Sequence, residues 1–150
     1  MNAKAIVVGA LVFWLVTNLL GMFVTGFFIH SMILKPTYQA TQSFWLPALN
    51  QDPPDMAALL PSWLMVSLVS SFVVAGIYSC ARSSFKGPGW KRGLTWGLSL
   101  GIFIFVHTFS MSGIFNLPLS LFVWWGIDGL ILFIPAGVAM GWATEKFAGA

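Results

Sequence analysis

Charge is what this sequence has least of. Only seven Lys or Arg and four Asp or Glu occur in 150 residues, so 7% of the chain is charged, whereas soluble domains carry about 25%. A water-facing surface cannot be built from so few charges, and 58% of the residues are hydrophobic. The composition therefore predicts a chain whose main solvent is lipid. The net charge of +3 is too small and too scattered to indicate nucleic-acid binding.

Cysteine and recognisable catalytic motifs are also scarce. Cys80 is the single cysteine, so the chain cannot form an internal disulfide. The sequence contains no Cys-x-x-Cys pair, no phosphate-binding loop and no His-Glu-x-x-His motif. We therefore expect a protein that is not an enzyme and that holds no metal.

The sequence is rich in long apolar runs. A helix needs roughly 20 apolar residues to cross a bilayer, and such runs occupy residues 5–34, 57–81, 93–115 and 119–143. An outer loop over 35–56 and a basic inner loop over 82–92 separate them. The predicted fold class is an all-α integral membrane protein. A single transmembrane domain over residues 1–150 would contain four transmembrane helices in two antiparallel hairpins.

Basic side chains predict the orientation of these helices. If the chain crosses four times, six of the seven basic residues lie on one side, and Lys35 alone lies on the other. Basic loops tend to remain in the cytoplasm, so we expect both termini to be cytoplasmic, in a bacterial inner membrane. Four residues near the inner loop are candidates for contact with lipid headgroups: Arg82, Lys86, Lys91 and Arg92.

Glycines on the third and fourth runs predict close helix packing. Lipid tails are as apolar as Leu, so small residues that let two backbones approach mark helix contacts in membranes. On each run the glycines share one helical face at about 100° per residue. They are Gly93, Gly97 and Gly101 on the third run and Gly126, Gly137 and Gly141 on the fourth.

The fourth run also carries Asp128, on the face opposite its glycines. A charged aspartate near the bilayer centre costs about 2.5 to 3.5 kcal/mol, so it should face protein or water. Both faces of this helix therefore need cover. We expect it to be central or to meet another subunit, in a homo-oligomer or with other membrane subunits.

Asp128 and the two histidines are the candidates for chemistry. His107 lies about eight residues from the outer end of the third run, and Asp128 lies about nine from the outer end of the fourth. The two side chains are then at nearly the same depth within one hairpin, and they could meet as a structural clasp or, alternatively, as a proton or ion relay. A group on a partner chain is the other candidate partner of Asp128. We expect His30 to lie at the membrane interface and to form a hydrogen bond near the headgroups, and a further alternative makes His30 and His107 the axial ligands of a haem or chlorin. Otherwise we expect no cofactor.

Three functions remain open at this point. The first is a non-enzymatic packing or accessory subunit of a homo-oligomer or of a larger inner-membrane complex. The alternative is a small transporter or channel that uses Asp128 and His107 as a relay. The third is an electron-transfer subunit that holds a haem or chlorin.

Overall fold

The computed structural model describes residues 2–149, and all the regular structure in this range is helical. Four helical segments are long and apolar enough to cross a membrane: Ala3–Ile33, Met56–Ser84, Gly89–Gly113 and Leu119–Ala148. Large hydrophobic side chains are exposed along all four of them. The prediction of an all-α chain with four apolar helices of membrane length is confirmed.

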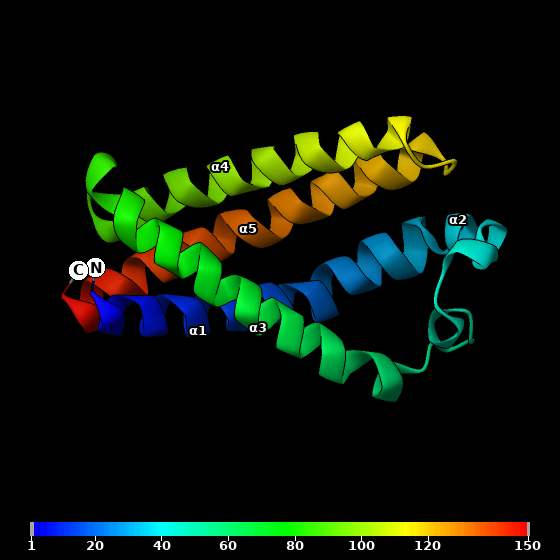
Figure 1. Ribbon diagram of the computed structural model, residues 1–150, viewed down its shortest axis with the longest axis horizontal. Helices are drawn as coiled ribbons and strands as arrows, with labels where there is room; N and C mark the ends of the chain where they lie inside the picture. Colours follow the sequence, from blue (N-terminus) through cyan, green and yellow to red (C-terminus); the bar gives the residue numbers. More distant parts are fainter. Residues whose placement is uncertain (1, 150) are drawn as a thin grey trace.

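The elements follow one another with few residues between them. In chain order they are α1 (Ala3–Leu20), η1 (Gly21–Ile33), α2 (Lys35–Ala40), η2 (Gln42–Phe44), η3 (Pro47–Leu49), α3 (Met56–Ala81), η4 (Arg82–Ser84), α4 (Gly89–Ser110), η5 (Met111–Gly113) and α5 (Leu119–Ala148). Figure 1 shows the two chain ends, the α3–α4 connection and the start of α4 at one end of the bundle. α2 and the α4–α5 turn lie at the other end.

α4 and α5 make the closest contact in the molecule. They run side by side in opposite directions (Figure 1), and glycines remove the side chains that would separate their backbones. A Cβ placed on Gly93 would overlap the carbonyl oxygen of Gly137, and a Cβ on Gly97 would overlap that of Phe133. A Cβ on Gly137 would in turn lie 2.5 Å from the carbonyl oxygen of Gly93. The two backbones are therefore in van der Waals contact.

α5 is the central helix of the chain. Its glycine face packs against α4, and α1 covers another face. Ala136 and Met140 of α5 are buried in one cluster with Ala10 and Phe13 of α1. The faces of the fourth helix are thus covered within a single chain, and its two-sided character does not require another subunit.

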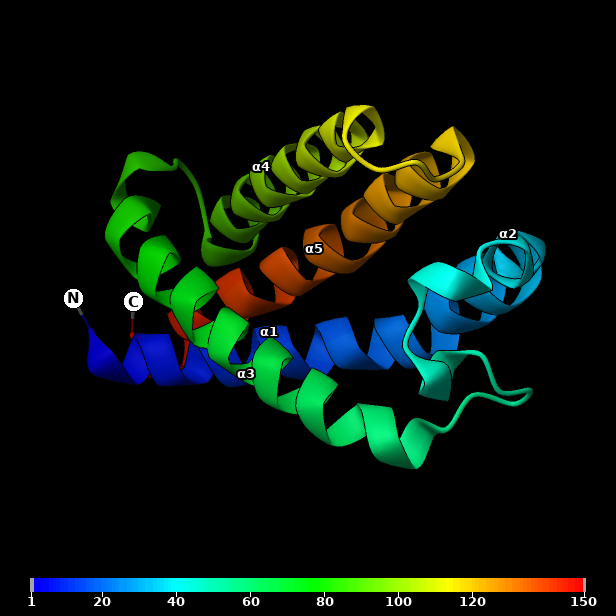
Figure 2. The ribbon, with the colours of Figure 1, turned by 45° about the vertical axis from the view of Figure 1, so that its right-hand side comes forward.

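α3 is the peripheral helix. Among the long helices it packs chiefly against α1. Its C-terminal half contributes Ala75 and Tyr78 to the core cluster, whereas its N-terminal half diverges from α5 in both Figure 1 and Figure 2. Most of the surface of α3 is consequently apolar and uncovered.

The first membrane-length helix changes its winding at Gly21. From there η1 is a π-helix, closed by hydrogen bonds between residues five apart, such as Leu34 N–H to the Ile29 carbonyl at 2.8 Å. At about 100° per residue, a continuous α-helix would place Thr25 about 120° and Ile29 about 160° around the axis from Phe13. All three are buried in the structure. The wider turns advance less per residue and so keep one face directed inward.

At the bundle end that holds the chain termini, α4 and α5 extend beyond their predicted bounds. α4 begins at Gly89 rather than at residue 93, because Glu145 Oε2 accepts the Gly89 N–H at 2.9 Å and satisfies a free donor of the first turn. α5 continues to Ala148 and ends at Gly149, which has the left-handed φ of 61° common after helices. Lys91 and Arg92, expected in the inner loop, therefore belong to the start of α4.

A pair of Gly→Ala substitutions tests the backbone contact. Gly97→Ala should lower the free energy of unfolding by about 1 to 3 kcal/mol, because the new methyl group has no space. Gly21→Ala is the matched control at the end of α1, where the backbone is helical and a Cβ meets nothing within 4 Å, and it should raise stability by up to about 1 kcal/mol through helix propensity. Denaturant unfolding in micelles, followed by circular dichroism, measures both. Equal shifts for the two variants would contradict the close contact.

Candidate functional site

The candidate site is a chain of four polar side chains in the half of the bundle farther from the chain termini, which is called outer below only to mark that position. It comprises His30 of η1, Tyr38 of α2, and Trp125 and Asp128 of α5. Trp125 Nε1 lies 2.9 Å from Tyr38 Oη, Tyr38 Oη lies 2.7 Å from His30 Nδ1, and His30 Nε2 lies 3.4 Å from Asp128 Oδ2. We call these four residues the outer polar cluster.

The donors and acceptors of the cluster fit one order. An indole nitrogen can only donate, so Trp125 donates to the Tyr38 oxygen. Tyr38 then has its own proton to give, and His30 Nδ1 accepts it. The other ring nitrogen, Nε2, carries the imidazole proton and donates to Asp128 across the longer contact. Any other order leaves the Tyr38 hydroxyl proton without an acceptor in the cluster.

The partial burial of His30 and Asp128 makes their hydrogen bond important for the stability of the fold. The side chain of Asp128 is 19% exposed and that of His30 is 33% exposed. Asp128 Oδ1 is buried and has no hydrogen-bond partner among the described residues. An acid held in this way depends on its one bond to His30, because losing the partner of a buried polar group costs about 1 to 3 kcal/mol.

Aromatic packing holds Tyr38 over the end of η1. Its ring lies parallel to that of His30, with centroids 6.0 Å apart, and edge-on to Trp45 at 5.3 Å. Trp45 Nε1 donates to Thr41 Oγ1 at 2.9 Å, which fixes the indole. Through these contacts the outer connection packs against the helices that carry His30 and Asp128.

The structure corrects the expected partner of Asp128. His107, predicted to meet it, is exposed on α4 and stacks on Phe103 with ring centroids 6.0 Å apart. The prediction considers only how far Asp128 and His107 lie along their helices. It does not consider in which direction each side chain points around its helix axis. At about 100° per residue, His107 lies about 120° around α4 from Gly101, which packs against α5. His30 takes its place because η1 turns that side chain inward.

Sequence reasoning missed two members of the cluster and a second polar contact. Tyr38 and Trp125 carried no signal beyond the usual enrichment of aromatic residues at membrane interfaces. Nearer the middle of α1, Asn18 Nδ2 lies 3.2 Å from Ser67 Oγ of α3, and Trp14 Nε1 donates to the same hydroxyl at 3.0 Å. An asparagine within an apolar run was the available signal for this second contact.

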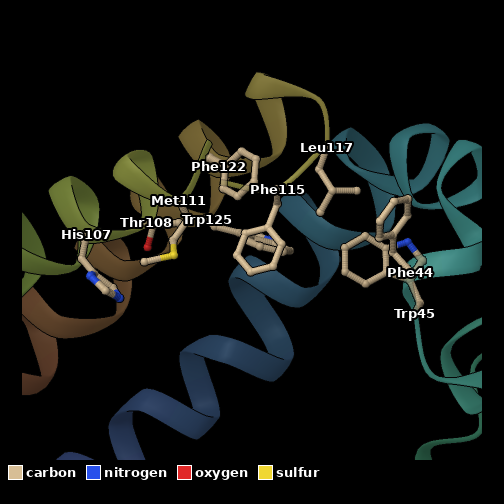
Figure 3. Close-up of a pocket in the computed structure, with 9 residues that line it drawn as sticks. All are labelled: Phe44, Trp45, His107, Thr108, Met111, Phe115, Leu117, Phe122 and Trp125. Carbon is tan, nitrogen blue, oxygen red and sulfur yellow. The ribbon is translucent and has the colours of Figure 1, made fainter. Parts of the chain in front are cut away.

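The two histidines considered as alternative axial ligands lie in different surroundings. Both ring nitrogens of His30 are engaged, by Tyr38 and Asp128. His107 lines a cavity to which Trp125 also contributes (Figure 3). Among residues 2–149, no group of three or more potential ligands could hold a metal ion.

The connection from α3 to α4 and the start of α4 carry the four candidate lipid-contacting residues. Both lie at the bundle end that holds the chain termini (Figure 1). Lys86 and Lys91 are exposed, and Lys91 Nζ lies 5.4 Å from the centre of the Trp90 ring. Arg92 Nε donates to the Gly87 carbonyl at 2.6 Å, and Arg82 is half-buried. Only the two lysines present fully accessible charges.

Comparisons with protein-family models, with curated proteins and with solved structures find no match to this chain. Its function therefore has to be inferred from the geometry of its own residues.

Burial raises the pKa of Tyr38 from 10.0 to about 12, against the opposing effect of the hydrogen bond from Trp125 and with a smaller contribution from the Asp128 charge. The folded state thus favours the neutral phenol. The stability that this group contributes is complete below about pH 10 and is lost as the pH rises toward about 12.

A titration tests the burial of Tyr38. The phenolate absorbance of the wild type minus that of Tyr38→Phe isolates this residue from Tyr78. We expect its midpoint near pH 12 in the folded protein and near pH 10 after unfolding. A midpoint of 10 in both states would show that Tyr38 is open to water and that the cluster is not formed.

Proposed function

We propose that this chain is a non-enzymatic integral membrane protein of a bacterial inner membrane. It acts as an accessory subunit, in a homo-oligomer or in a larger membrane complex. The described residues outside the four long helices form one outer connection and short turns. Contacts with other proteins would therefore be made mainly by helix faces.

The proposed orientation has both termini in the cytoplasm. Asn2 Nδ2 donates to the Ala148 carbonyl at 3.1 Å, so the two ends of the chain lie together. The connection from α3 to α4 lies at the same end of the bundle (Figure 1). Six of seven basic residues belong to these segments, and this bias favours the cytoplasmic side.

Gly76 is the observation that carries the accessory role. An added Cβ on Gly76 would meet nothing within 4 Å, as is also true of Gly21, where α1 passes into η1, and of Gly113 at the end of its helix. The other glycines of α1, α3, α4 and α5 lie where another helix or side chain comes close. Val73 and Ile77 beside it are 57% and 52% exposed. A glycine costs about 1 kcal/mol in a helix, and on this face its remaining use is the close approach of a helix from another chain.

The outer polar cluster supports a structural role. A hydrogen bond between membrane helices contributes about 0.6 to 2 kcal/mol, less than the cost of an aspartate at depth. Asp128 is therefore better suited to fixing the register of η1, α2 and α5 than to adding stability.

Native mass tests the accessory role. The gently solubilised wild-type protein should have a mass well above the 16.4 kDa of one chain. Gly76→Leu should release the monomer, since the new side chain would separate the helices, while leaving the helical circular dichroism unchanged. Val73→Leu is the control, because that position already carries a branched side chain and should retain the complex. A monomeric wild type, or an intact complex in Gly76→Leu, would exclude this interface.

The second candidate is a small transporter or channel in which the cluster relays protons. The ordered chain from Tyr38 through His30 to Asp128 favours it, because each group donates to the next. The expected relay through His107 is replaced here by one through His30.

Asp128→Asn separates the two candidates. An amide keeps the size and can accept the bond from His30, but it does not ionise. In a structural role Asp128→Asn should preserve folding, whereas Asp128→Leu should lower stability by about 1 to 3 kcal/mol because His30 loses its acceptor. In a relay, wild-type proteoliposomes should pass protons faster than protein-free vesicles, and Asp128→Asn should abolish that flux. Wild-type flux no greater than that of protein-free vesicles would rule out the relay.

A further inference from the structure

A cavity of about 410 Å³ lies at the outer end of the bundle, against Trp125. Figure 3 shows that its lining comes from α4 and η5, the turn between α4 and α5, the start of α5 and the outer connection. This volume lies within the range of small-molecule sites, about 300 to 1,000 Å³. The residues used below are Phe44, Trp45, His107, Thr108, Phe122 and Trp125.

The cavity has no charged side chain in its lining, apart from the titratable His107. A phosphate or carboxylate headgroup needs Arg or Lys partners when it leaves water. An ammonium group needs a carboxylate for the same reason. The ligand chemistry that fits is therefore neutral.

Two polar groups in the lining have no protein partner. His107 and Thr108 lie on the last turn of α4. Neither side chain makes a hydrogen bond to another described residue; the Ser110 hydroxyl donates to the backbone carbonyl of His107, not to its ring. The indole N–H of Trp125 is already given to Tyr38. An imidazole and a hydroxyl can each donate or accept, so they suit a carbonyl or hydroxyl oxygen.

Aromatic side chains form much of the remaining wall. Trp45 and Phe122 each meet Trp125 edge to face, with centroids 6.0 Å and 5.8 Å apart and planes crossed at 76° and 78°. Phe122 is 1% exposed, so its ring supports Trp125 from behind. Trp45 and Trp125 are partly exposed, and their crossed rings leave flat faces available to a further ring. Saturated chains would gain no such geometric preference.

We propose that this cavity binds a neutral planar ring compound with ring oxygens, of the quinone or quinol class. The ring lies against Trp45 and Trp125, and an oxygen bonds to His107 and Thr108. The position near the end of α4 suits a molecule whose polar ring sits near the membrane interface and whose tail enters lipid. The proposal concerns binding alone, and it does not depend on the accessory role.

The test uses decylubiquinone and the intact chain in lipid nanodiscs. Decylubiquinone should quench the tryptophan fluorescence of the protein in a saturable way. The quenching of free tryptophan mixed with empty nanodiscs is subtracted as the background. His107→Leu and Thr108→Val should each weaken binding roughly three- to tenfold, the loss expected for one hydrogen bond. His107→Gln, which retains a donor, should bind within about threefold of the wild type. Thr95→Val is the matched control, because Thr95 lies on α4 outside the cavity and bonds to its own helix.

Competition identifies the ligand class. Decanol and palmitate at equal concentration should displace little decylubiquinone. Equal displacement by decanol would show a groove for acyl chains and overturn the proposal. Non-saturable quenching, or unchanged affinity in both His107→Leu and Thr108→Val, would overturn it as well. Circular dichroism and elution volume establish that each variant is folded before its affinity is compared.

Discussion

The contact between the backbones of α4 and α5 is the constraint on which the rest of the structure depends. Gly93, Gly97 and Gly137 bring carbonyl oxygens against the facing helix, which fixes the rotation of both helices. With that rotation set, Asp128 is left on the side where η1 passes. His107, on α4, is directed to the outer cavity instead. A small change in this contact would alter both polar sites together.

The polar contacts then specify what apolar packing leaves undetermined. Apolar surfaces slide against one another in lipid at little cost, because the tails resemble the side chains. Hydrogen bonds, in contrast, form only at one relative position of two helices. Such bonds join His30 to Asp128 and join Trp14 and Asn18 to Ser67. One pair ties η1 to α5, and the other ties α1 to α3. Together they set the register of α3 and α5 against the first membrane-length helix.

Much of the architecture could be predicted from the sequence because hydrophobicity and glycine spacing are local signals. Four apolar runs gave the helices, and the spacing of Gly93, Gly97 and Gly101 selected the face of α4 that meets α5. The partner of Asp128 could not be predicted in the same way. Its identity depends on the π-helical winding of η1, which brings Thr25 and Ile29 inward, and no residue pattern in that run indicates such winding. Tyr38 comes from a connection whose path only the folded chain determines.

The winding of η1 also bears on how the molecule fits a bilayer. As a continuous α-helix, 31 residues from Ala3 to Ile33 would extend about 46 Å, against a hydrocarbon thickness of about 30 Å. Wider turns lower the rise per residue, so the same residues span a shorter height. Part of the hydrophobic mismatch is thus absorbed inside the helix, and less has to be met by tilt or by local thickening of the membrane. The first helix therefore needs less membrane thickness than its 31 residues would need as an α-helix.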